Sequence, residues 1–154
     1  MTLVHAAKGK LVFRVGDSEK SLLTTLLELY PRVTSAATLS SPSRKARHPK
    51  ETEALLEEAL ADQRAQNKKQ VKAFLADANR FEKVDDGWRF SLAPAEADWM
   101  LRVLNDIRIG SWVALGSPEE RLDVLDQNNL RDFWAMEISG RFEAVLLEAL
   151  SGGH

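Results

Sequence analysis

The sequence contains no cysteine, and this absence excludes several classes of protein. Disulfide bonds, thiolate catalysis, and zinc or iron–sulfur sites with cysteine ligands all require that side chain. Histidine is scarce as well, since only His5, His48 and His154 are present. None of them has a helical neighbour at the spacing that metal ligands need, so we predict neither a metal site nor a cofactor.

Long apolar runs are missing too. No stretch approaches the roughly 20 apolar residues that a membrane-spanning helix needs, and residues 1–10 lack the apolar run of a signal peptide. The formal net charge of -2 gives the whole molecule no field that would attract nucleic acid or a membrane. We therefore expect a cytoplasmic protein without membrane contact.

The remaining composition is that of an ordinary folded protein. Hydrophobic residues make up 44% of the 154 positions and charged residues 29%, which favours a packed core over disorder. We predict a single domain over residues 1–154, with a frayed tail at 151–154. The predicted fold class is mostly α: a helical bundle of about five helices with a small antiparallel β-hairpin, packed mainly through its C-terminal half.

The first half of the chain predicts a strand and two helices. Residues 11–15 alternate between apolar and polar positions as a strand does, and Asp17 or Ser18 can cap a helix that runs to Tyr30. Residues 51–80 predict a long helix whose middle is unusually polar. Such a helix either crosses solvent or breaks into two pieces, and the sequence leaves both possibilities open.

Residues 31–50 predict a flexible basic loop, because they have two internal prolines and no periodicity. Arg44, Lys45 and Arg47 lie in this loop and give the one hint of nucleic-acid binding. No aromatic residue is interleaved with them, and acidic residues follow from Glu51 onward. We therefore favour a solvated loop over an arm that contacts phosphate.

A β-hairpin is predicted at the middle of the chain. Asp-Asp-Gly at residues 85–87 lies between the β-forming segments 81–84 and 88–92, and Asp-Gly in such a context is a strong turn signal. Because two strands alone are marginal in water, residues 11–15 are the candidate for a third strand.

The helix predicted over residues 94–115 has one residue out of pattern. Arg108 falls inside the apolar sector of this helix. Its guanidinium cannot lose its charge there, so it must reach water or a carboxylate. We favour a partly buried ion pair, with Asp132, Glu137 or Glu143 as partner, over an arginine that binds an anion at a pocket.

Two further helices are predicted, one from the capping box of Ser117 and Glu120 and a last one that ends at about Leu150. The last helix has two apolar stripes on nearly opposite sides, although a peripheral helix needs only one. It is therefore sandwiched inside the domain, which is the default, or it presents one stripe to another chain. The first stripe consists of Trp134, Ile138, Phe142, Val145 and Ala149, and the second stripe of Phe133, Met136, Gly140, Ala144 and Leu147.

A resemblance to a known family begins at the hairpin. Asp86-Gly87, Leu92 and the run from Met100 to Arg108 resemble the bacterial family of unknown function DUF2017, most clearly at Leu104-Asn105-Asp106-Ile107-Arg108. Residues 40–50 depart from its pattern. The resemblance implies no activity, but it implies a link to Clp-type proteolysis, because such proteins are often encoded near the Clp adaptor. It also singles out Asn105, Asp106 and Arg108 as candidate binding residues.

No catalytic constellation is found, and no catalytic residue is predicted. We expect a non-enzymatic protein-interaction or regulatory domain, with the second stripe as its interface and a second copy or another protein as its partner. One alternative is a small nucleic-acid-binding regulator that uses the basic loop. The other is a small-anion sensor or an enzyme built around Arg108.

Overall fold

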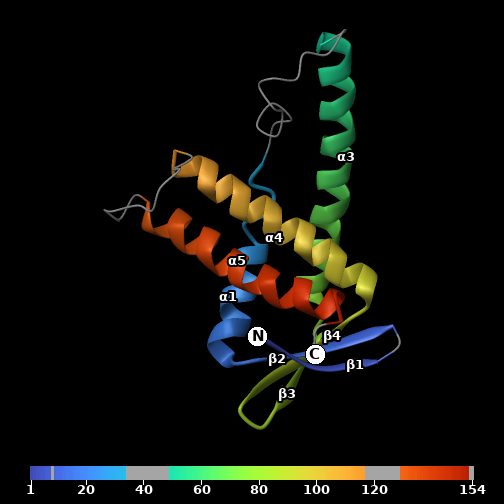
Figure 1. Ribbon diagram of the computed structural model, residues 1–154, viewed down its shortest axis with the longest axis vertical. Coiled ribbons are helices and arrows are strands. Elements are labelled where there is room, and N and C mark those ends of the chain that lie inside the picture. Colours follow the sequence, from blue (N-terminus) through green and yellow to red (C-terminus); the bar gives the residue numbers. More distant parts are fainter. Residues whose placement is uncertain (8, 34–48, 117–128, 153–154) are drawn as a thin grey trace.

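The computed structural model describes residues 1–7, 9–33, 49–116 and 129–152. Within these ranges the chain forms a four-stranded sheet and four helices (Figure 1). The elements are β1 (Thr2–Ala7), β2 (Lys10–Val15), α1 (Asp17–Leu27), α3 (Pro49–Ala76), β3 (Phe81–Val84), β4 (Gly87–Leu92), α4 (Pro94–Ala114) and α5 (Leu130–Leu150). The mostly helical class is confirmed, although four helices stand where about five were expected. The helix predicted from Ser117 lies outside the described residues.

The sheet is antiparallel, with the strand order β1-β2-β4-β3. The predicted hairpin is confirmed as β3 and β4, and β2 joins it as the third strand with Leu11 opposite Leu92. Gly87 permits the close approach of β4 to β2, because a Cβ atom there would lie 2.5 Å from the carbonyl oxygen of Val15.

The fourth strand, β1, was not predicted, so the description of a small hairpin was wrong about the size of the sheet. β1 is an edge strand whose side chains are exposed or half-buried, and its register against β2 shifts between Leu3 and His5. A strand that buries no regular face leaves no alternating apolar pattern in the sequence.

Helix α1 begins one residue earlier than a cap at Asp17 or Ser18 would allow, so that prediction was wrong. Gly16 is the N-cap residue, and its amide donates to the Glu19 carboxylate at 3.0 Å. Asp17 instead accepts a hydrogen bond of 2.7 Å from the indole Nε1 of Trp88 on β4. The Asp17 side chain therefore attaches the start of α1 to the sheet instead of capping the helix.

Helix α3 is one continuous helix, which decides the question that its polar middle left open. It begins at Pro49 and ends at Ala76, a little before the predicted limits. Its C-terminal half packs on the domain through the buried residues Asn67, Val71 and Phe74. Its N-terminal half projects away from the body of the molecule (Figure 1).

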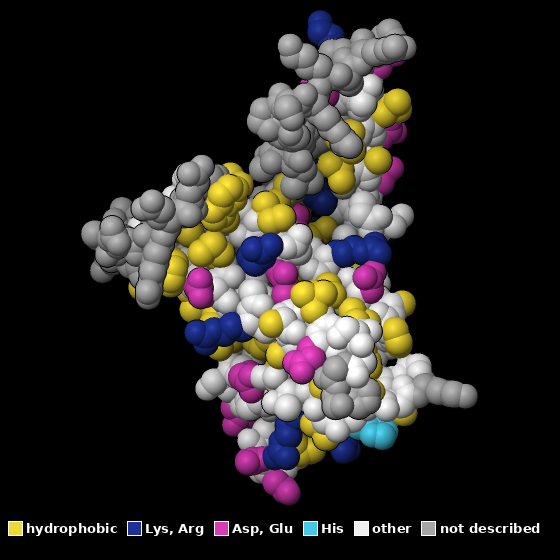
Figure 2. Space-filling view, viewed as in Figure 1, with side chains coloured by type: hydrophobic (Ala, Val, Ile, Leu, Met, Phe, Trp, Pro, Cys, Tyr) yellow, Lys and Arg dark blue, Asp and Glu magenta, His cyan; other side chains and the backbone are white. Residues whose placement is uncertain are grey.

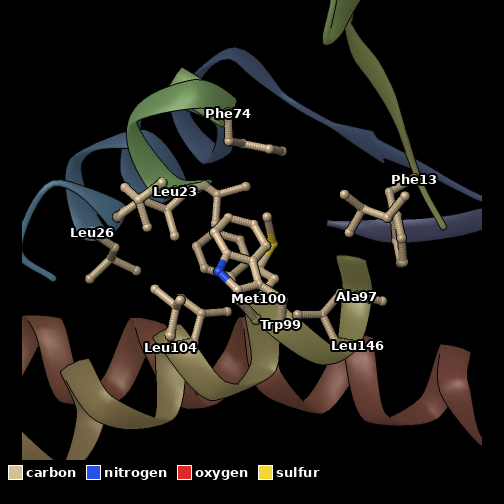
Figure 3. Packing of buried hydrophobic residues seen from close by; sticks show 14 of the residues in the cluster. Phe13, Leu23, Leu26, Phe74, Ala97, Trp99, Met100, Leu104 and Leu146 are labelled. Atoms are coloured by element: carbon tan, nitrogen blue, oxygen red, sulfur yellow. The ribbon is translucent and has the colours of Figure 1, made fainter. Parts of the chain in front are cut away.

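The core is built from both halves of the chain, so the prediction of a mainly C-terminal core was wrong. Phe13 of β2 stacks on Phe90 of β4 with ring centroids 5.4 Å apart. Helix α1 contributes fully buried leucines that pack near those of α4 and α5 (Figure 3). These residues include Leu23, Leu26, Met100, Leu104 and Leu146. Helices α4 and α5 run antiparallel beside each other across this core (Figure 1).

Candidate functional site

Helix α5 packs the first of its two apolar stripes in or against the core, and the second stripe is not part of the core cluster. The buried side consists of Ala135, Ser139, Phe142, Leu146 and Ala149, which agrees with the first stripe at Phe142 and Ala149. In the second stripe, Leu147 is 56% exposed and Ala144 is also exposed, while Phe133, Met136 and Gly140 are half-buried. Helix α5 packs on α4, α1 and β1, and within the described part of the chain the second stripe contributes no buried residue.

Arg108 forms the ion pair that its position on an apolar sector required. Its Nε atom lies 3.4 Å from Oε1 of Glu143 on α5, and its NH2 group donates to Oδ1 of Asn105 at 3.0 Å. The Arg108 side chain is 45% exposed and that of Glu143 only 12%. Burial raises the pKa of Glu143, and the charge of Arg108 opposes that rise. Of the three carboxylates considered, Glu143 is the partner.

Arg108 also lies at the margin of the second stripe. A Cβ atom built on Gly140 would lie 3.9 Å from Cδ of Arg108, so the arginine side chain extends from α4 to the middle of α5. Trp112, one turn further along the same flank of α4, is a large and partly exposed apolar residue. Figure 2 shows apolar side chains gathered over the end of the helix pair where α4 ends and α5 begins. The second stripe and the α4 flank thus form one surface.

Asp106 lies elsewhere, although it is only two residues from Arg108. Its Oδ1 atom accepts hydrogen bonds from the amides of Arg32 at 2.8 Å and Val33 at 3.3 Å. Burial raises the pKa of Asp106, and these two hydrogen bonds oppose the rise. Arg32 also pairs with Asp132 of α5 at 2.9 Å. The segment that contains Arg32 crosses α4 at Gly110, because a Cβ atom on Gly110 would lie only 2.4 Å from Cβ of Arg32.

Helix α3 holds the same crossing segment from its other side. Arg64 donates to the carbonyl oxygen of Val33 at 3.1 Å, and Asn67 donates to the hydroxyl of Tyr30 at 3.2 Å. The segment after α1 is therefore fixed by α3, α4 and α5 together. Asp106 serves this attachment, so the structure does not bring Asp106 and Arg108 into one binding site.

Two cavities flank Arg80, just after α3, with volumes of about 390 and 320 Å³. The Arg80 guanidinium pairs with Glu96 at 3.0 Å and donates to the carbonyl oxygen of Ser91 at 3.1 Å. It also lies over the ring of Phe74, 5.1 Å from its centroid. Neither cavity is lined by histidine or by Arg108.

The predicted nucleic-acid contacts of the basic loop, Arg44, Lys45 and Arg47, are not among the residues that the structure describes. Within the described part of the chain, no three histidine or carboxylate side chains are grouped so that they could hold a metal ion. None of the helices described has the length and apolar character needed to cross a membrane.

No family model, curated protein or solved structure matches the chain. The resemblance to DUF2017 therefore stays a prediction. The surface formed by the second stripe and the Arg108 flank is the feature from which a function can be argued.

Proposed function

We propose that the protein is a non-enzymatic protein-interaction domain that binds its partner through the second stripe of α5 and the adjoining flank of α4. One observation carries this proposal: α5 packs one side into the core, and its second stripe still has Ala144 and Leu147 exposed and its other three residues only half-buried. A peripheral helix needs only one buried stripe, and exposed apolar surface beyond it is typical of a site that another molecule covers.

The arrangement of charges around the stripe supports the same function. Protein interfaces combine an apolar centre with a polar rim that water can reach. The centre here is Gly140 and Ala144, with Glu137 and Arg141 exposed on one flank and the Arg108 ion pair on the other. The alternative built on Arg108 lacks such support, because Arg108 is paired with a carboxylate of α5 and lines neither of the two cavities. The basic residues on which the other alternative rests lie outside the described part of the chain.

A regulatory role connected with Clp-type proteolysis is the context that the DUF2017 resemblance adds to this proposal, and the sequence composition adds the expectation of a cytoplasmic location. The resemblance bears on which protein the partner is, whereas the second stripe bears on which surface binds it. The surface can be tested without knowing the partner.

A photo-crosslinking side chain placed at Leu147 tests the surface in the cell that naturally makes the protein. Val4 on β1 is the matched control, because it is also apolar and has a similar exposure, 58% against 56%. We expect a discrete crosslinked species from position 147 and none from position 4. If position 147 gives no crosslinked species, or if both positions give the same ones, the proposal is overturned.

A further inference from the structure

We infer that the partner is a second copy of this chain, packed antiparallel on the second stripe about a two-fold axis at Gly140. This inference rests on the function proposed above and names the partner for the same surface. Its starting point is the symmetry of the stripe. Met136 and Ala144 lie four residues before and after Gly140, and Phe133 and Leu147 lie seven residues before and after it.

A two-fold interface requires such symmetry, because residue i contacts residue j of the other copy and j contacts i. About an axis at Gly140, Phe133 meets Leu147 of the second copy and Met136 meets Ala144. The small residue stands at the centre and the largest ones stand at the ends. Two crossing helices approach most closely at the centre and separate toward their ends, so the side-chain sizes follow the gap that they must fill.

The two helical glycines of the α4–α5 pair differ in a way that supports this inference. Gly110 is required by packing within the chain, because a Cβ atom there would overlap Arg32. Gly140 has no such requirement, since the nearest atom to an added Cβ would be Cδ of Arg108 at 3.9 Å. Glycine is a poorer helix former than alanine. A close contact with a second helix would explain why α5 carries one.

The charges that flank the stripe match those of a second copy. Glu137 and Arg141 are both exposed on one flank, three residues before and one residue after the axis. The two-fold operation places Glu137 beside Arg141 of the second copy, about 3 Å apart along the helix axis. On the other flank Arg108 lies next to Gly140, so two arginines and two Glu143 carboxylates gather near the axis with balanced charge.

The absence of cysteine makes the arrangement directly testable with single-cysteine variants of the full chain. Gly140→Cys places the new thiols of two copies at the axis, where a disulfide can bridge Cα atoms about 4.4–6.8 Å apart. Under mild oxidation at micromolar concentration we expect Gly140→Cys to form a covalent dimer at least tenfold faster than Leu55→Cys. Leu55 is the control because it is 68% exposed and lies on the projecting half of α3. Equal rates for the two variants overturn the inference.

A second measurement follows the register. A mixture of Met136→Cys and Ala144→Cys is expected to give mostly the mixed disulfide, whereas each variant alone gives little. Light scattering of the unmodified chain should show a dimer, and Gly140→Leu should raise its dissociation constant at least tenfold with an unchanged circular dichroism spectrum. A strict monomer at high concentration overturns the inference. If position 147 still crosslinks to a protein of another mass, the proposed function survives and only the second copy is excluded.

Discussion

Arg108 on α4 and Glu143 on α5 form an ion pair in which the carboxylate is far more buried than the guanidinium. This asymmetry follows from side-chain length, because the arginine can extend along α5 past Gly140 to reach water while the glutamate cannot. The two partners are therefore not equivalent in their contribution to stability.

Loss of the arginine should cost more than loss of the carboxylate. Arg108→Met leaves Glu143 half-buried without its cation, and we expect the free energy of unfolding to fall by about 1–2 kcal/mol at pH 7. Glu143→Gln should cost less than about 1 kcal/mol, because Arg108 still reaches water. The double variant Arg108→Met/Glu143→Leu should recover most of the loss. Urea unfolding checks all three, and equal costs for the single variants would contradict the asymmetry.

The two helical glycines should respond to alanine with opposite signs. Gly110→Ala forces a Cβ against Arg32 and should lower the free energy of unfolding by about 1–3 kcal/mol. Gly140→Ala meets no backbone and should raise it by up to about 1 kcal/mol through helix propensity. Thermal unfolding of dilute, monomeric protein separates the two. A stabilised Gly110→Ala variant would mean that the segment after α1 does not cross α4 there.

The buried carboxylate of Asp106 predicts a particular dependence of stability on pH. Its pKa is raised by burial, so the native state binds more protons than the unfolded state between the ordinary aspartate pKa, about 4, and the higher native value. Wild type should therefore gain stability relative to Asp106→Asn as the pH falls from 7 toward 4.

Asp17 supplies a control of opposite sign. The hydrogen bond from Trp88 and the charge of Lys83 lower its pKa, so its stabilising contribution is present above pH 4 and is lost as the pH falls through the lowered native value. Wild type should therefore lose stability relative to Asp17→Asn as the pH falls from about 4 toward the lowered native pKa of Asp17. Urea unfolding at a series of pH values checks both variants, and slopes of the same sign would rule out the explanation.

Helix α3 should be stable in one half only. Its buried residues within the described part of the chain, Asn67, Val71 and Phe74, lie in the C-terminal part, and isolated helical turns are marginal in water. We expect amides at 53–62 to exchange with solvent at least about tenfold faster than those at 68–76. Hydrogen exchange resolved by residue measures this directly. Uniform protection along α3 would show that its projecting half is held by contacts not described above.

The features that the sequence predicted well were those with a local pattern. The alternation at residues 11–15 and the Asp-Gly turn led to three strands in correct association, because each signal lies within a few residues. The position of a charged Arg108 among apolar residues predicted an ion pair. Three carboxylates were possible partners, and only the packing of α5 on α4 shows that the partner is Glu143.

The features that it missed depend on contacts without a local pattern. Asp106 binds backbone amides of Arg32 and Val33, and any residue except proline presents the same amide. Nothing in the sequence therefore marked that segment as the partner. Gly110 gave no signal either, because a helical glycine reveals its role only when the chain that crosses it is known.

The position of β2 between β1 and β4 has a consequence for the chain while it is being synthesised. β2 pairs with β4 only after the ribosome has released residues 87–92, which follow both α1 and α3 in the chain. Until then β2 has one strand edge without its partner, and the face that carries Phe13 lacks Phe90. Such an edge can pair with another unfinished chain. The speed of translation between β2 and β4 is therefore expected to govern how much of the protein reaches the folded state in the cell.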